Sequence, residues 1–166
     1  MGYNSGANAR LLPCLSRNYS CHPNVQGFSP LDFAPFNREN VNVIFGIGTD
    51  IIEVARIEKM AAKGTQYLET IFTKQERDYC ETRVRKSEHY AARYAAKEAF
   101  LKALGTGWRD GLAFCDIEVI NDELGKPQIF PHGSVKNFLD QHQIKQISTS
   151  ISHVKEIAIA VVILEK

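Results

Sequence analysis

A single carboxylate stands among basic side chains in residues 90–107, which read YAARYAAKEAFLKALGTG. The stretch is rich in Ala, Leu, Lys and Glu, residue types that favour a helix. At 3.6 residues per turn, Arg93 lies one turn from Lys97, and Glu98 lies one turn from Lys102. Several cations beside one carboxylate on a rigid element suit the binding of a metal ion and a polyphosphate. The alternative is an ordinary amphipathic helix, whose Glu–Lys pair contributes only about 0.3–0.5 kcal/mol.

A second carboxylate occurs in residues 45–60, which read FGIGTDIIEVARIEKM. The β-branched and aromatic residues Val43, Ile44, Phe45 and Ile47 predict a strand over residues 43–47. Gly46 and Gly48 would let this strand pass close to another segment or form a bulge. Their G-x-G spacing lacks the third glycine of a Rossmann motif, so it does not indicate a dinucleotide site. Asp50 falls where the strand is expected to give way to a helix, and its carboxylate is either a helix N-cap or a metal ligand.

The segments GIGTDIIEVARI and RYAAKEAFLKALGTG together resemble the two signature motifs of the holo-acyl-carrier-protein synthases. These small transferases move 4′-phosphopantetheine from coenzyme A to a serine of an acyl carrier protein. Both motifs occur in order, and the resemblance extends over residues 44–166. It implies an enzyme in which Asp50 and Glu98 hold magnesium. It also implies coenzyme A as the donor substrate and an apo acyl carrier protein as the acceptor.

The reaction that this resemblance implies breaks the pyrophosphate of coenzyme A. A serine hydroxyl attacks the β-phosphorus, and adenosine 3′,5′-bisphosphate leaves. The phosphate oxygens need charge neutralisation, which a hard divalent cation supplies. By resemblance, Lys102 stabilises the developing charge or protonates the leaving group, and Arg93 and Lys97 bind the phosphates. The serine proton would pass to Glu98 or to a magnesium-bound water, and the water is favoured because a metal-bound carboxylate is a weak base.

The resemblance places further coenzyme A contacts outside the central helix. His153 matches the histidine of the family's S-I-[ST]-H segment, although a lone histidine also suits a structural role. Gly105 and Gly107 would let their loop approach the pyrophosphate, and Pro127 would border the adenine. Many relatives carry another histidine where this chain has Ser148, so any role of that histidine is not transferred.

The resemblance also implies protein partners. Arg56, on the first helix after the metal aspartate, would contact the acidic carrier, and Met60 would add an apolar contact one turn on. A surface arginine and a core methionine are the alternative. The family often forms a homotrimer with active sites at the subunit boundaries. Two other kinds of function are a non-catalytic coenzyme A or nucleotide-binding module and an inactive structural subunit. The joint presence of both metal carboxylates, Lys102 and Arg93 argues against them.

The periodicity of the chain predicts the elements that would position these residues. A capping box, Thr73 with Glu76, opens one helix, while Ser87 is expected to cap the central helix and Gly105 to end it. The apolar run IAIAVVIL at residues 157–164 predicts a strand in mid-sheet or at a subunit contact. Other helices are expected at residues 52–62, 66–72 and 135–142, and other strands at residues 113–120, 127–130 and 144–152. Together they predict an α+β domain whose long helix packs on a mainly antiparallel sheet.

Composition narrows the remaining classes. A chain of 166 residues has the size of one domain, and a net charge of +1 argues against general nucleic-acid binding. No apolar run approaches the ~20 residues that span a bilayer. The four cysteines show no C-x-x-C spacing, so we expect free thiols and a cytoplasmic location. Residues 1–43, rich in Pro, Asn, Ser and Gly, predict a flexible extension before the domain at residues 44–166. An organellar location follows if that extension is a targeting signal.

Overall fold

One long helix lies at the centre of the part of the chain that the structure, a computed structural model, describes: residues 43–107 and 111–166. Apart from Val43, the predicted extension over residues 1–43 lies outside the described residues. None of the helices within the described ranges is both long and apolar enough to cross a membrane. The elements follow in the order β1 (Ile44–Glu53), α1 (Val54–Ala61), α2 (Thr65–Glu69), α3 (Lys74–Glu81), α4 (Lys86–Leu104), the 3-10 turn η2 (Phe114–Asp116), β2 (Ile117–Asn121), β3 (Pro127–Pro131), α5 (Gly133–Gln141), β4 (Gln146–His153) and β5 (Ile157–Glu165).

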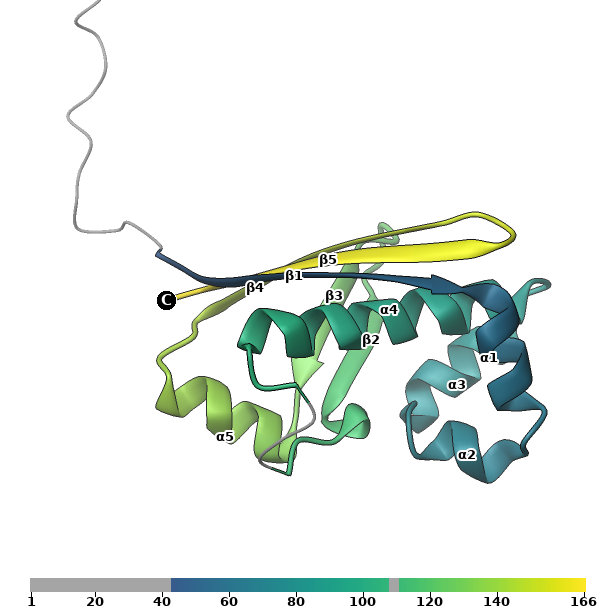
Figure 1. Cartoon of the computed structure of the whole chain (residues 1–166), viewed down its shortest axis with the longest axis horizontal. Coiled ribbons are helices and arrows are strands. Elements are labelled where there is room, and N and C mark those ends of the chain that lie inside the picture. The colour runs from purple at the N-terminus through teal and green to yellow at the C-terminus, as the bar shows by residue number, and fades with distance from the viewer. Residues whose placement is uncertain (1–42, 108–110) are drawn as a thin grey trace, which may run out of the picture. The chain divides into compact units, whose positions relative to one another are not determined.

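A three-stranded antiparallel sheet covers α4, with its strands in the order β1-β5-β4. In Figure 1, α4 runs beneath this sheet, α1, α2 and α3 gather near one of its ends, and α5 lies near the other. Strands β2 and β3 form a separate antiparallel hairpin. The apolar run predicted for mid-sheet is β5, which pairs with both neighbours. The structure confirms the predicted α+β class and the packing of the long helix on an antiparallel sheet.

Small side chains bring the sheet and the helix close together. On α4, Ala95 and Ala99 are fully buried, and on β5 the alternate residues Ala158 and Ala160 are buried in the same core. The side chains of a strand point alternately to its two faces, so this alternation gives β5 one covered face and one exposed face. The covered face joins a single apolar core with α4. The sheet therefore holds β1, and the carboxylate on it, at a fixed position over the helix.

Two glycines of β1 lie directly on the backbone of α4. A Cβ atom added to Gly46 would collide with the carbonyl oxygen of Ala103, and one added to Gly48 would collide with that of Ala99. Both partners are backbone atoms, which cannot turn aside as a long side chain can. The structure thus confirms the close approach that the two glycines predict, and it shows that α4 is the segment approached.

The ends of α3 and α4 test the predicted caps. Thr73 and Glu76 form the full capping box at the start of α3, as predicted. Gly105 ends α4 with a φ of +75, the left-handed conformation that favours glycine. The predicted cap Ser87 is wrong, because α4 begins at Lys86 and Ser87 lies inside its first turn. The residue before the helix is Arg85, which makes no side-chain cap.

Strand β1 is longer than predicted. Its pairing with β5 continues to Glu53, so Asp50 lies within the strand, opposite Ala160. The helix expected from residue 52 begins at Val54. The alternative role of Asp50 as a helix N-cap is therefore excluded, because the backbone there is paired in the sheet.

Candidate active site at the crossing of β1 and α4

The predicted metal aspartate and the predicted catalytic lysine form an ion pair. Lys102 Nζ lies 2.7 Å from Asp50 Oδ1 and donates a second hydrogen bond, of 3.1 Å, to the Thr49 carbonyl. The Asp50 side chain is 15 % exposed and that of Lys102 is 53 % exposed. Because Lys102 is half exposed, water screens this pair, and it contributes less to stability than a fully buried pair would. Lys102 can therefore leave Asp50 for another anion at small cost.

Glu98 lies one turn before Lys102 on α4 and is half-buried. Its Oε1 accepts a hydrogen bond of 3.1 Å from the hydroxyl of Tyr94. Burial, together with the charge of Glu98, raises the pKa of Tyr94 to about 12, so this hydroxyl remains protonated at neutral pH. The Arg56 guanidinium lies 5.8 Å from the Tyr94 ring centroid, within the range of a cation–π contact. Sequence reasoning missed Tyr94, although its i,i+4 spacing to Glu98 was visible.

The two carboxylates are suitable ligands for magnesium. Magnesium prefers hard oxygen donors and usually takes one or two carboxylates, with phosphate oxygens and water completing its coordination. Asp50 and Glu98 supply two such carboxylates from two elements that pack against each other. Within residues 43–107 and 111–166, no three His, Cys, Asp or Glu side chains gather into a complete metal site. Two carboxylates are a donor set that magnesium could complete with phosphate oxygens and water.

Lys97 does not lie where the sequence predicted. Its side chain is fully buried, and its Nζ donates to Glu76 Oε2 at 2.7 Å, to the Ile71 carbonyl at 2.8 Å and to the Phe114 carbonyl at 3.0 Å. These three acceptors match the three N–H groups of an ammonium. Burial lowers the pKa of Lys97, and the charge of Glu76 opposes that shift. The predicted contact of Lys97 with phosphate is corrected accordingly, because the side chain ties α4 to α3 and to the 3-10 turn.

Arg93 is also largely enclosed, at 3 % exposure. Its Nη2 donates to Asn121 Oδ1 at 2.8 Å, and its guanidinium carbon lies 4.0 Å from the ring centroid of Tyr79. Its Nε is buried without a hydrogen-bond partner among the described residues. Its Nη1 also donates to the His89 carbonyl at 3.4 Å. An arginine held by these three contacts is well placed to fix the β2–β3 hairpin beside α4.

His153, at the end of β4, lies beside the first turns of α4. Its Nδ1 is 3.3 Å from Glu88 Oε2, and its ring centroid is 5.2 Å from that of His89. Burial lowers the pKa of His89, and the nearby charges of His153 and Arg93 add to that effect. Pro127 begins β3 directly opposite Asn121, the partner of Arg93.

The predicted site residues fall into two groups on opposite sides of α4. The Asp50 group comprises Asp50, Glu98 and Lys102, and the Arg93 group comprises Arg93, His153 and Pro127. Each helical residue turns the chain by ~100°, so nine residues place Arg93 about 180° from Lys102 around the helix. The sheet shows the same division, because β1 carries Asp50 at one edge, β4 carries His153 at the other, and β5 lies between them.

The other predicted residues lie after the end of α4 and on α1. Gly105 and Gly107 follow the end of α4 with φ values of +75 and +60, and, apart from the adjacent residues of the chain, no atom of the described residues lies within 4 Å of a Cβ atom added to either. Arg56 is exposed on α1 and reaches the group through the ring of Tyr94. Met60, one turn after Arg56, is partly buried against the core. Asp50, Glu98 and Arg56 each contact a residue of α4: Asp50 pairs with Lys102, Glu98 accepts from Tyr94, and Arg56 lies over the Tyr94 ring.

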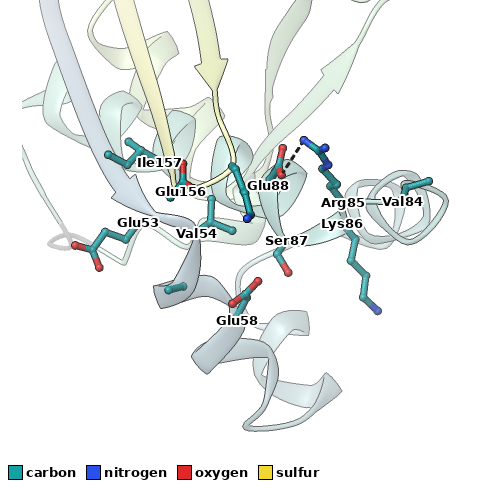
Figure 2. A pocket seen from close by; sticks show the side chains of 12 residues that line it. Glu53, Val54, Glu58, Val84, Arg85, Lys86, Ser87, Glu88, Glu156 and Ile157 are labelled. Carbon is teal, nitrogen blue, oxygen red and sulfur yellow. Dashed lines mark ion pairs between the residues drawn. The ribbon is translucent and has the colours of Figure 1, made fainter.

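A cavity of about 800 Å³ opens where β1 runs into α1, beside the start of α4 and the turn between β4 and β5. Neither Asp50, Glu98 nor Lys102 lines it. Figure 2 shows Glu88 in its wall, paired with Arg85 at 3.7 Å, and Glu88 also contacts His153. Acidic and basic side chains both line the cavity. It therefore adjoins the Arg93 group and does not mark the predicted metal site.

Known proteins share this sequence and this architecture. Residues 46–162 match the sequence model of the 4′-phosphopantetheinyl transferase superfamily. The chain is 44 % identical over 125 residues to a holo-[acyl-carrier-protein] synthase of Geobacter sp. (strain M21), covering 75 % of this chain and 100 % of that protein. It is similar to the solved holo-[acyl-carrier-protein] synthase of Neisseria meningitidis, with a TM-score of 0.70 and 36 % identity over 75 % of this chain and 100 % of the other.

A further solved relative contains a nucleotide. The holo-(acyl-carrier-protein) synthase of Bacillus anthracis was solved in complex with CoA (3′,5′-ADP), and it matches with a TM-score of 0.61 and 44 % identity over 74 % of this chain and 96 % of its own. These matches extend over nearly the whole length of each relative and over the described domain. The chain therefore belongs to the holo-[acyl-carrier-protein] synthases, enzymes of the 4′-phosphopantetheinyl transferase superfamily.

Proposed function

We propose that the protein transfers 4′-phosphopantetheine from coenzyme A to a serine of an apo acyl carrier protein. The serine oxygen forms a bond to the β-phosphorus, the bond from that phosphorus to the bridging oxygen breaks, and adenosine 3′,5′-bisphosphate leaves with the electron pair. The serine proton would pass to Glu98 or, preferably, to a water at the metal site. The observation that carries this proposal is the Asp50–Lys102 pair, with Glu98 one turn away, at the crossing of β1 and α4.

Within this site, Asp50 and Glu98 would hold magnesium, which neutralises charge on the phosphate oxygens when bound. Lys102 would exchange Asp50 for a phosphate oxygen, since the lysine is half exposed and its side chain is long. There it would stabilise the charge that develops on the leaving group. Lys102 and the two carboxylates thus have separate tasks, which separate substitutions can distinguish.

Coenzyme A would extend from the Asp50 group to the Arg93 group. The open loop at Gly105 and Gly107 supports a close approach of the pyrophosphate. Pro127 and His153 remain proposed contacts for the nucleotide, and Arg93 would support them by fixing the hairpin. The complexes of the Bacillus anthracis and Helicobacter pylori relatives with coenzyme A support coenzyme A as the donor substrate here.

The acceptor would be an acidic carrier protein that docks on α1. Arg56 is exposed there, and Met60, one turn on, offers an apolar surface that is only partly buried. Attraction between Arg56 and an acidic carrier would weaken with salt, because the Debye length is only ~8 Å at physiological ionic strength. The short route from Arg56 through Tyr94 to Glu98 supports this placement of the carrier.

A homotrimer would complete the site. On one chain the Asp50 group and the Arg93 group lie on opposite sides of α4, so a neighbouring copy can supply the second group to the first. The outer face of the sheet supports such a contact, because it exposes apolar side chains. Their exposures are 59 % for Ile47, 64 % for Ile51, 41 % for Ile159 and 37 % for Val161. Apolar surface of this kind, gathered on one sheet face, typically marks an interface.

The first test is to incubate the protein with coenzyme A, magnesium and an apo acyl carrier protein, and to measure the carrier's mass. We expect a gain of one phosphopantetheine that EDTA abolishes. Binding of coenzyme A without any transfer to several carriers would instead favour the alternative function, a non-catalytic coenzyme A-binding module.

Substitution of Glu98 tests the metal assignment. Glu98→Gln keeps the size of the side chain and removes its charge, so we expect transfer to fall by at least about 100-fold while the protein stays folded. Glu81→Gln is a matched control, because Glu81 also accepts a tyrosine hydroxyl, from Tyr90 at 3.1 Å, and lies on α3. Full activity of a folded Glu98→Gln protein would remove Glu98 from the site.

Mixing two inactive variants tests the shared site. Glu98→Gln damages the Asp50 group, and His153→Ala damages the Arg93 group. If one copy supplies each group, mixed trimers contain some sites with both groups intact, and co-expression should restore part of the activity. Sedimentation checks that the variants assemble together. Co-assembly with no recovered activity would contradict a site built from two copies.

A further inference from the structure

Tyr94 contacts both a proposed metal ligand, Glu98, and a proposed carrier-binding residue, Arg56. Its hydroxyl donates to Glu98 Oε1 at 3.1 Å, and the Arg56 guanidinium lies 5.8 Å from its ring centroid. The ring stacks on Phe114 with centroids 5.4 Å apart and planes inclined by 27°, and the whole residue is 6 % exposed. A side chain held in this way has little freedom to move. Glu98 and Arg56 therefore depend on one rigid support.

We propose that Tyr94 is a positioning residue whose hydroxyl fixes the Glu98 carboxylate for the metal and whose ring holds Arg56 for the carrier. This inference rests on the proposed function, because it assigns a role toward the metal and the carrier. The hydroxyl donates to Oε1 of Glu98, so Oε2 is the oxygen that would take a cation. A ligand whose rotamer is fixed in advance loses less conformational freedom on binding, so its affinity for the metal rises.

The same helix contains a matched control. Tyr90 lies one turn before Tyr94, is 3 % exposed, and donates its hydroxyl to Glu81 Oε1 at 3.1 Å. The two tyrosines share burial, helix and type of partner, but Glu81 is not a residue of the proposed site. Tyr90→Phe and Tyr94→Phe therefore remove equivalent hydrogen bonds, and only the second should affect Glu98.

The first experiment measures the binding of Mn²⁺, as a probe for the divalent cation, to the full chain with coenzyme A present. Electron paramagnetic resonance of the free ion gives the affinity without any turnover. We expect Tyr94→Phe to weaken Mn²⁺ binding by about 10-fold or more, the usual effect of removing a partner of a metal ligand. We expect Tyr90→Phe to bind as the wild type does. Thermal unfolding of both variants checks that they lose similar stability.

The second experiment separates the ring from the hydroxyl. Tyr94→Phe keeps the ring under Arg56, so the KM for the carrier should stay within about 2-fold of the wild-type value. Tyr94→Leu removes the ring as well, so the same KM should rise. A rise in this KM that is equally large in Tyr94→Phe would overturn the role of the ring.

The outcomes distinguish this inference from the proposed function. If the wild type binds no Mn²⁺, the metal assignment is wrong, and the role of Tyr94 falls with it. If the wild type binds Mn²⁺ and Tyr94→Phe binds it equally well, only the role of Tyr94 is overturned. Weaker binding by Tyr94→Phe alone, with Tyr90→Phe unchanged, supports both.

Discussion

Two lysines of α4 form ion pairs of equal length with opposite consequences. Lys97 Nζ lies 2.7 Å from Glu76 and Lys102 Nζ lies 2.7 Å from Asp50. Both side chains of the first pair are 0 % exposed, and Lys97 also uses two carbonyls. In the second pair, Lys102 is 53 % exposed. The distance between charges therefore does not reveal what a pair does, whereas burial and the remaining partners do.

The difference separates stability from chemistry on one helix. Glu76 uses both carboxylate oxygens, because Oε2 accepts from Lys97 and from the Thr73 amide while Oε1 accepts from the Val119 amide. A ligand that displaced Lys97 would break its hydrogen bonds and leave the buried Glu76 carboxylate without its cation. Lys102 can change partners without such a loss, so it is the lysine of the two that can take part in a reaction.

Substitution of the buried lysine should have the largest effect. Lys97→Met leaves the Glu76 carboxylate buried without its cation, and we expect unfolding free energy to fall by about 3–5 kcal/mol. Urea unfolding followed by circular dichroism measures this loss. Adding Glu76→Gln removes the uncompensated charge, so the double variant should recover part of the stability. If the unfolding free energy of Lys97→Met fell by less than about 1 kcal/mol, the buried Lys97–Glu76 pair would contribute no more to stability than the Lys102–Asp50 pair.

Substitution of the exposed lysine should show the reverse pattern. Lys102→Ala should lower the rate of phosphopantetheine transfer by about 100–1,000-fold, because a group that stabilises developing charge is lost. Its unfolding free energy should change by no more than about 1 kcal/mol. Lys74→Ala is the control, since Lys74 forms a comparably short pair with Asp78, 2.6 Å, exposed on α3. It should change neither quantity, and a similar loss of rate in Lys74→Ala would contradict a specific role of Lys102.

The smallest expected effect is a pH dependence of stability that arises from His89, which is less buried than Lys97 and more buried than Lys102. Burial first, and then the charges of His153, Arg93 and Arg83, lower its pKa below the usual 6.5, while Glu88 opposes them. As the pH is lowered through 6.5, the unfolded chain binds a proton at this position before the folded chain does. Stability therefore decreases as the pH decreases, until the folded pKa is reached.

Urea unfolding at pH 7.5 and at pH 5.5 measures this dependence. His89→Gln removes the titrating group and should make the loss of stability between the two pH values smaller than in the wild type. An unchanged or larger loss in the variant would show that His89 does not contribute to the acid sensitivity.

Local patterns in the sequence predicted the features that depend on neighbouring residues. Thr73 and Glu76 cap α3, and Gly105 ends α4, because these motifs need only a few adjacent residues. The glycines of β1 predicted a close approach, although they did not identify the segment approached. For Asp50 and Glu98, the motif gave the residues, and the structure added the Lys102 and Tyr94 contacts.

Other features depend on contacts that no local pattern contains. The spacing of Lys97 and Lys102 predicts where they lie around the helix, but not which turn is covered by α3 and the 3-10 turn. Only the fold shows that Lys97 meets Glu76, 21 residues away. Likewise, the pairing of β1 with β5 extends the strand past Asp50, and this depends on a segment more than a hundred residues later.

The glycine contacts of β1 make motion at the site one-sided. Gly46 and Gly48 rest on carbonyl oxygens of α4, so the strand has already reached its distance of closest approach. Repulsion rises steeply below that distance, whereas attraction weakens gradually beyond it. The strand can therefore lift away from the helix more readily than it can press closer. Asp50 belongs to this strand and Glu98 to this helix. The distance between their carboxylates would therefore resist shortening more strongly than lengthening if a cation were bound between them.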